Sequence, residues 1–212
     1  MANKAKLLTK EQIIDAAYEQ IDETGYRNCS MRSLAKTLGV SAMTLYSYVD
    51  SKEDIFACVF ERFIAKVDVS AVPGERWDDT VRRVMGSWYG LIQQHNYISS
   101  LDRWEPSFNS IKGLAAAFIN LCLEQGMPQG VASKLWRMCS ALTVGAGLRI
   151  RGESIAYGQL LEELDKVAST LAERVYVDSY REDAFALDIE AVIGHVRWEA
   201  GEAADMWRTP TA

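Results

Sequence analysis

Apolar residues recur every three or four positions along most of this chain, the spacing of one face of an α-helix. No stretch alternates apolar and polar residues between hairpin turns, as paired strands would. The breaks between periodic segments coincide with Gly, Pro and Asn, residues that commonly end helices or form turns. The pattern therefore predicts an all-α protein.

The first predicted helix begins after Thr9 and ends at Gly25. Residues 9 to 12 read Thr-Lys-Glu-Gln, the form of a capping box, in which two side chains satisfy backbone N–H groups at a helix start. Apolar residues then repeat at helical spacing as far as the glycine. They are Ile13, Ile14, Ala17, Tyr18 and Ile21.

Two short helices are predicted next, joined at Gly39. Ser30 can cap the first helix, and Ser41 can cap the second, which should run to about Tyr48. A glycine suits the junction because a tight turn between packed helices requires an unusual backbone conformation. The first helix has an apolar stripe of Leu34, Ala35 and Leu38. The arrangement is typical of a helix-turn-helix.

The second of these helices can pack inward through Val40 and Leu45. The opposite side, where a groove of DNA would lie, carries Ala42, Met43 and Tyr46. Thr44 and Tyr48 share a flank from which hydroxyl groups can donate to phosphate oxygens. A further capping signal, Ser51-Lys52-Glu53-Asp54, follows at once. Its lysine would add a cation to a helix N-terminus, an end that already favours anions, so we expect Lys52 to hold a phosphate.

The run from Leu34 to Asp54 resembles the DNA-binding signature of the tetracycline-repressor-like (TetR) regulators. It reads Leu34-Ala35-x-x-Leu38-Gly39-Val40-Ser41-x-x-Thr44-Leu45-Tyr46-x-Tyr48-Val49-x-x-Lys52-Glu53-Asp54. The resemblance extends over roughly residues 9 to 60, about a quarter of the 212 residues. It implies a homodimer in which each subunit inserts the helix that begins at Ser41 into the major groove of operator DNA.

Carried over by position, the resemblance also implies which residues contact the operator. They are Arg32, Ser41, Ala42, Met43, Thr44, Tyr46, Tyr48 and Lys52. Arg32 would reach a phosphate or a guanine edge. Ala42 and Met43 lack hydrogen-bonding side chains, so readout there would depend on thymine methyl groups or on DNA shape, and the operator sequence stays open.

Charge is distributed unevenly along the chain, whose formal net charge is -6. Residues 1–52 hold seven Lys and Arg against six Asp and Glu, whereas the remaining residues hold 16 against 23. Because phosphate neutralisation dominates affinity for duplex DNA, we expect binding that is salt-sensitive and dependent on dimerisation.

The rest of the composition points to a cytoplasmic protein. There is no apolar run long enough to span a membrane and no signal-peptide core at the N-terminus. The four cysteines form no Cys-x-x-Cys pair, which favours reduced, buried thiols. The two histidines, His95 and His195, lie near no spaced set of ligands, so we expect no metal, no cofactor and no catalytic residues.

We assign residues 1–54 to a helix-turn-helix DNA-binding domain, continued by a linker helix over about 52–69, and residues 70–212 to a helical domain for effector binding and dimerisation. Within the latter, periodicity predicts helices over about 75–94, 107–125, 131–151, 157–177 and 183–199, with a short piece near 97–104.

The dimer surface is expected to involve residues 131–151, which are apolar and rich in small side chains that let another helix approach closely. The partner helix would be 157–177 or 183–199. The run Phe185-Ala-Leu-Asp-Ile189 is similar to the C-terminal helix of the family branch nearest the tetracycline repressors, where that helix helps form a four-helix dimer interface. We therefore favour 131–151 with 183–199.

An effector pocket is expected inside the second domain, where aromatic residues are dense. The candidates are Trp88, Tyr89, His95, Tyr97, Trp104, Phe108, Phe118, Met127, Trp136, Met138 and Arg149. Apolar walls with few polar groups suit a drug-sized molecule, although the same residues also describe a plain core.

Two functions follow from these patterns. The first is a ligand-responsive transcriptional regulator, a repressor released from its operator by a small hydrophobic or aromatic molecule. The alternative is a helical carrier or enzyme in which the N-terminal helices only pack.

Overall fold

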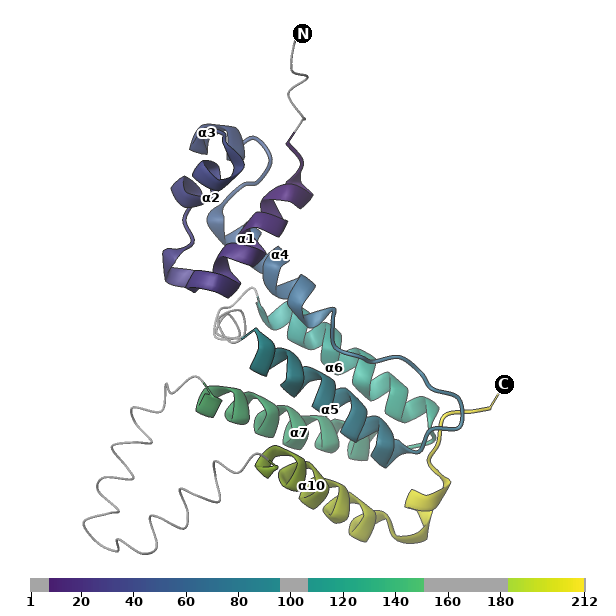
Figure 1. Ribbon diagram of the computed structural model, residues 1–212. Coiled ribbons are helices and arrows are strands. Elements are labelled where there is room, and N and C mark those ends of the chain that lie inside the picture. The colour runs from purple at the N-terminus through teal and green to yellow at the C-terminus, as the bar shows by residue number, and fades with distance from the viewer. Residues whose placement is uncertain (1–7, 96–106, 151–182, 212) are drawn as a thin grey trace, which may run out of the picture. The chain divides into compact units, whose positions relative to one another are not determined.

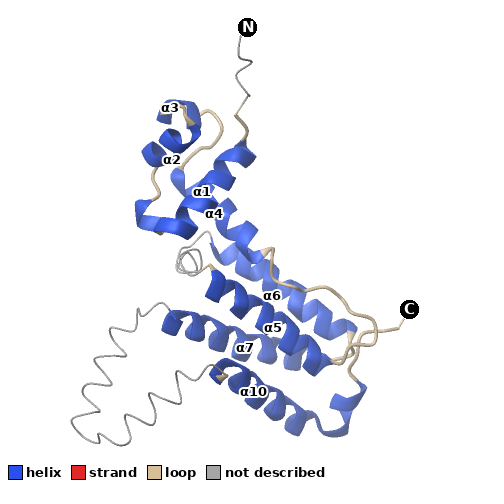
Figure 2. Cartoon of the chain, viewed as in Figure 1, coloured by secondary structure: helices blue, strands red, loops and turns tan. Residues whose placement is uncertain are grey.

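The computed structural model describes residues 8–95, 107–150 and 183–211 (Figure 1). Every regular element within these ranges is helical, as Figure 2 shows, so the prediction of an all-α protein is confirmed. The chain divides into two compact units, one made of residues 1–66 with 94–113 and the other of residues 67–93 with 114–212.

The first unit begins with helices whose ends agree with the capping signals of the sequence. Its elements are α1 (Lys10–Thr24), the 3-10 turn η1 (Tyr26–Asn28), α2 (Met31–Leu38), α3 (Ala42–Leu45) and α4 (Lys52–Ile64). The Thr9 hydroxyl accepts the Gln12 N–H, and the Gln12 side chain accepts the Thr9 N–H, which completes a capping box. Ser30 and Ser51 cap α2 and α4 in the same manner, by accepting the N–H three residues on.

Two of the predicted helices are shorter than expected. The helix expected to run from Ser41 to about Tyr48 leaves the α conformation after Leu45, and residues 46–48 form a turn. There the Ser47 N–H bonds the Thr44 carbonyl and the Tyr48 N–H bonds the Leu45 carbonyl, so the backbone tightens and brings Val49 into the core. The linker helix ends at Ile64 instead of residue 69, because Lys66 N–H already bonds the Phe63 carbonyl in a tighter turn.

The core of the first unit lies between α1, α2 and α4. It is built from the apolar stripes that the sequence predicts, including Ile13, Ala17, Ile21, Leu34, Ile55, Phe56, Val59 and Phe60. On the surface, the Arg62 guanidinium of α4 binds two carboxylates of α1, those of Glu11 at 2.8 Å and of Asp15. Such exposed pairs add modestly to stability, and here they join residues that are 51 and 47 positions apart in the chain.

The second unit is built of long helices. It contains nearly all of α5 (Trp77–Gln94), the part of α6 (Ser107–Glu124) that begins at Leu114, α7 (Gln129–Ile150) and α10 (Ala184–Ala200), followed by the 3-10 turn η3 (Gly201–Met206). The predicted helix at 157–177 and the short piece near 97–104 lie outside the described residues. Trp88 of α5 stacks on Trp136 of α7 with ring centroids 5.7 Å apart, and Phe118 of α6 lies 5.8 Å from Trp136.

A nearly buried carboxylate, Asp78, ties α5 to α10. It is 5% exposed and lies within 3.2 Å of nitrogen atoms of Arg76, Arg82 and Arg197. Burial raises the pKa of Asp78, but hydrogen bonds from Arg76 and Arg82 more than offset this and leave the pKa below its usual value. Arg82 also binds Glu190 of α10 at 2.6 Å. The charges therefore hold α10 against the start of α5.

Close packing between α5 and α7 depends on Gly147. A Cβ at this position would lie 2.8 Å from Cγ2 of Ile92, closer than real side chains approach. The small residues of this helix were expected to serve a dimer contact, but the close neighbour at Gly147 is α5 of the same chain.

Candidate nucleic-acid interface

The α2 and α3 helices meet at Gly39, which adopts the left-handed conformation with φ +69°. This conformation is easy for glycine and strained for other residues, so Gly39 allows α2 to end and α3 to begin after only three intervening residues. The Gly39 N–H bonds the Lys36 carbonyl, and the Val40 N–H bonds the Ala35 carbonyl, which closes the end of α2. The turn thus fixes where α3 begins.

The α3 helix has one buried and one exposed side. Leu45 is fully buried, whereas Met43 is 80% exposed and Tyr46 is 50% exposed. Exposed apolar side chains mark a surface of interaction only where they form a contiguous patch. Ala42, between the two extremes, is half-buried. Of the three residues predicted to face DNA on this side, Met43 and Tyr46 are therefore exposed to solvent and Ala42 only partly so.

Hydroxyl groups of α3 are partly engaged within the helix. The Ser41 Oγ accepts the Thr44 N–H at 3.1 Å and lies 2.8 Å from Thr44 Oγ1. This pair orders the N-terminus of α3, the end at which a phosphate is favoured. Tyr48 is half-buried on the turn that follows, and Arg32 is exposed in the first turn of α2.

Lys52 stands at the first position of α4 and contacts two aromatic rings. Its Nζ lies 4.9 Å from the ring centroid of Tyr26 and 4.8 Å from that of Phe56. Nearby, burial raises the pKa of the Cys29 thiol to about 11, and the Lys52 charge opposes this rise. A role for Lys52 could be predicted from its neighbours in the sequence, because it follows a capping serine. Its contact with Tyr26 could not be predicted from sequence spacing, because Tyr26 lies at the boundary of an earlier helix.

Two helices joined by a left-handed glycine, with a sealed inner face and an exposed outer face on the second helix, define a helix-turn-helix protein. Residues 13–59 match the model of a family described as "Bacterial regulatory proteins, tetR family". This match confirms, over these residues, the resemblance noted in the sequence.

Individual relatives match a limited part of the chain. An "HTH-type transcriptional regulator" of Saccharopolyspora erythraea is 30% identical over 100 residues, which are 47% of this chain and 42% of that protein. "Tetracycline repressor protein class D" of Escherichia coli is 34% identical over 77 residues, 35% of each chain. The chain thus spans less than half the length of these curated relatives.

The similarity of fold extends further than the similarity of sequence. A crystal structure of the TetR family protein ActR from Streptomyces coelicolor, in complex with (S)-DNPA, has a TM-score of 0.71 and 22% identity, and covers 91% of this chain and 98% of ActR. This likeness shows that the fold of the chain, including the helical second unit, is similar to that of ActR.

The residues predicted to line an effector pocket occupy different environments. Trp88, Phe118 and Trp136 form the aromatic cluster between α5, α6 and α7. Tyr89 stacks on Phe185 of α10 with centroids 4.1 Å apart, Met127 is buried, and Met138 lines a groove between α7 and α10. Tyr97 and Trp104, and the side chains of Phe108 and Arg149, lie outside the described part of the structure. The effector pocket stays a prediction.

His95 lies in the first unit and is paired with α1. Its Nδ1 is 2.8 Å from the Asp22 carboxylate, and its ring meets the rings of Tyr18 and Phe63 edge-on at 5.7 and 6.2 Å. This arrangement was not foreseen, because the partners of His95 are distant from it in the sequence.

The described ranges lack two other structural features. No three His, Cys, Asp or Glu side chains in these ranges are grouped to hold a metal ion. None of the helices described is both long and apolar enough to cross a membrane.

Proposed function

We propose that this protein is a dimeric transcriptional regulator of the cytoplasm, a repressor that binds operator DNA and is released by a small hydrophobic or aromatic molecule. The observation that carries the proposal is the exposure of Met43 on the capped α3 and of Tyr46 directly after it, within the segment that matches the tetR family. A helix of this kind places its first residues at base edges in the major groove. No catalytic role is assigned to any residue.

The four side chains that we assign to this surface each suit a chemical group of duplex DNA. Met43 suits a thymine methyl group, and Tyr46 can reach a base edge or a phosphate. Lys52 and Arg32 would neutralise phosphates, which supplies most of the affinity. Two such surfaces, one from each subunit, would contact half-sites about 34 to 36 Å apart.

The proposed dimer surface is the outer face of α7 and α10. The inner face of α10 is buried within the subunit through Phe185, Ile189, Val192, Ile193 and Val196. A second apolar stripe faces outward at helical spacing, in which Leu187 is 51% exposed and Trp198 is 81% exposed, with the small residues Ala191 and Gly194 between them. A helix that is apolar on both faces requires a second partner.

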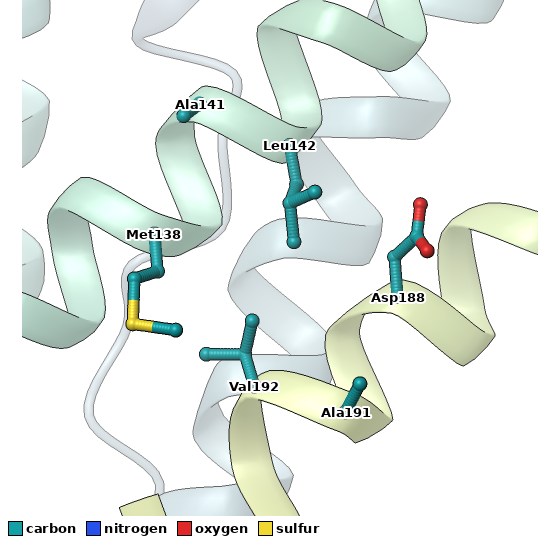
Figure 3. Close-up of a pocket in the computed structure, with 6 residues that line it drawn as sticks. All are labelled: Met138, Ala141, Leu142, Asp188, Ala191 and Val192. Atoms are coloured by element: carbon teal, nitrogen blue, oxygen red, sulfur yellow. The ribbon is translucent and has the colours of Figure 1, made fainter. Parts of the chain in front are cut away.

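A groove of about 510 Å³ runs beside this stripe. Met138 and Leu142 of α7 face Val192 of α10 across it, and Ala141, Asp188 and Ala191 complete the lining (Figure 3). The same two helices of a second subunit could fill this groove with their own outward side chains. An isologous pair of this kind would form a four-helix interface.

The dimer is tested by Trp198→Glu, which places a charge in the outer stripe at its most exposed side chain. We expect this variant to be monomeric by analytical ultracentrifugation and to bind DNA at least about tenfold more weakly, because one subunit supplies only half of the phosphate contacts. Leu123→Glu, at a site 38% exposed on α6, serves as the control and should stay dimeric. A wild-type protein that sediments as a monomer, or a dimeric Trp198→Glu, would contradict the assignment.

DNA binding is tested with a fluorescent duplex that the wild-type protein selects from a random-sequence pool. Tyr46→Ala and Lys52→Ala should weaken binding while leaving the fold and dimer intact, and Lys52→Ala should also reduce the salt slope by about one phosphate contact per subunit. Lys112→Ala, an exposed lysine of α6, is the charge-matched control. If no duplex is enriched, the carrier or enzyme alternative is favoured.

The release step is supported by the fold shared with ActR, whose structure contains (S)-DNPA, and by the aromatic cluster around Trp136. A ligand that binds one conformation of the second unit more tightly than the other would shift the protein toward that conformation. If the two conformations space the two α3 helices of the dimer differently, both helices could no longer contact their half-sites at once. Screening aromatic compounds for loss of the protein–DNA complex tests this step. Equal affinity for DNA in the presence of every compound that binds the protein would argue against the switch.

A further inference from the structure

The Lys52 side chain lies against two rings that also contact one another. The centroids of Tyr26 and Phe56 are 4.6 Å apart at an angle of 59°, and the ammonium lies 4.9 and 4.8 Å from them. A cation within about 6 Å of a ring centroid is attracted by the ring quadrupole. Lys52 therefore interacts with two rings at once.

The rings are themselves fixed by the fold. Phe56 is fully buried one turn after Lys52 on α4, so its position follows from the helix. Tyr26 follows Gly25, whose φ of +87° ends α1 and turns the chain into η1. The Cys29 that closes this segment is also fully buried. The site that holds the ammonium is thus formed by elements on both sides of the helix-turn-helix.

A free lysine would lose conformational entropy when a phosphate fixes it. Its long flexible side chain has many rotamers, and restricting them opposes binding. A side chain held in place before binding avoids part of this loss. Lys52 as a whole is half-exposed at the N-terminus of α4, an end that favours anions.

We propose that Tyr26 and Phe56 are positioning residues for DNA binding, which hold the Lys52 ammonium ready for a backbone phosphate. The inference rests on the proposed function, since it assigns a task to residues that do not themselves face the groove. It differs from a packing role in one respect: the effect of the Tyr26 ring on affinity must act through Lys52.

The experiment is a double-mutant cycle of Tyr26→Leu and Lys52→Ala, measured by fluorescence anisotropy on the selected duplex. Tyr26→Leu keeps apolar bulk but removes the ring, and should weaken binding about two- to fivefold for each half-site. Tyr26→Phe keeps the ring and should bind like the wild type. In the Lys52→Ala background, Tyr26→Leu should cause no further loss.

Replacement of Tyr26 by pentafluorophenylalanine provides a second variant should Tyr26→Leu fail to fold. The ring keeps its shape while its quadrupole reverses, so affinity should fall by a similar factor when Lys52 is present and stay unchanged in the Lys52→Ala background. Tyr18→Leu is the matched control, because Tyr18 also lies under a lysine, at 4.4 Å from Lys66 Nζ, away from α3 and the start of α4. It should leave affinity for the duplex unchanged.

The outcomes separate the inference from the proposed function. Equal losses from Tyr26→Leu in both backgrounds would show a packing role and overturn the inference, as would wild-type affinity for the pentafluoro variant. Wild-type affinity for Lys52→Ala would overturn it as well, while leaving DNA binding by α3 in place. Failure of the wild-type protein to select any duplex would refute the proposed function and the inference together.

Discussion

Substitution of Gly147 by alanine tests how tightly the second unit is packed. The added methyl group would lie 2.8 Å from Ile92 Cγ2 and 3.4 Å from Ile92 Cδ1. Ile92 is 4% exposed and β-branched, so its side chain has few alternative rotamers and no solvent to move into. Either α5 and α7 move apart or the isoleucine takes a strained conformation.

The magnitude follows from two opposing terms. Overpacking a well-packed core costs about 1–3 kcal/mol. Replacing glycine by alanine within a helix gains about 0.5–1 kcal/mol because the unfolded chain is less flexible. Gly86 of α5 has nothing within 4 Å of an added Cβ, so Gly86→Ala measures the gain alone. The two variants should therefore differ by about 1–3 kcal/mol in free energy of unfolding, with Gly147→Ala the less stable.

Urea unfolding followed by circular dichroism, at one fixed protein concentration, gives both free energies. Adding Ile92→Leu, which removes the clashing Cγ2 methyl at nearly constant volume, should restore much of the loss in Gly147→Ala. Equal stabilisation by Gly147→Ala and Gly86→Ala would refute the argument, because it would mean that α5 and α7 are not in the close contact described.

Two further predictions concern a cap and a carboxylate. Ser41→Ala should lower the free energy of unfolding by about 1 kcal/mol and weaken DNA binding, because α3 loses the hydroxyl that accepts the Thr44 N–H. Ser41→Gly should lower the free energy of unfolding by only a few tenths of a kcal/mol. Similar urea midpoints for the two variants would contradict the capping role. Hydrogen bonds from Arg83 lower the pKa of Glu75, so its contribution to stability is complete above the unfolded pKa of about 4.3 and is lost as the pH falls through the lower folded value. The free energy of unfolding of Glu75→Gln, measured by urea titration, should therefore fall less between neutral and acid pH than that of the wild type. An equal fall in both proteins would show that the Glu75 carboxylate does not contribute to the pH dependence.

The helix starts of the first unit could be predicted because their signals are local. Thr9, Ser30, Ser41 and Ser51 each accept the backbone N–H three residues on, as their positions in the sequence indicate. The length of α3 could not be predicted, because burial of Val49, a tertiary effect, ends the helix before its pattern ends.

Contacts between residues far apart in the chain could not be predicted from the spacing of apolar residues. The rings beside Lys52, the pairing of His95 with Asp22 and the contact of Gly147 with Ile92 all join segments that only the fold brings together. A signal was present for the outer face of α10, because its apolar residues occur all round the helix. The three- and four-residue periodicity that was used to predict this helix identified only the inner face of α10.

The exposure of Met43 and Tyr46 has a consequence for how such proteins diversify. Since neither side chain is buried, a point mutation at either position should cost little in folding, and under the proposed function it would change what this surface presents to a base pair. A duplicated gene would then acquire a new target sequence by drift at these two positions, while Gly39 and Leu45 keep the scaffold unchanged.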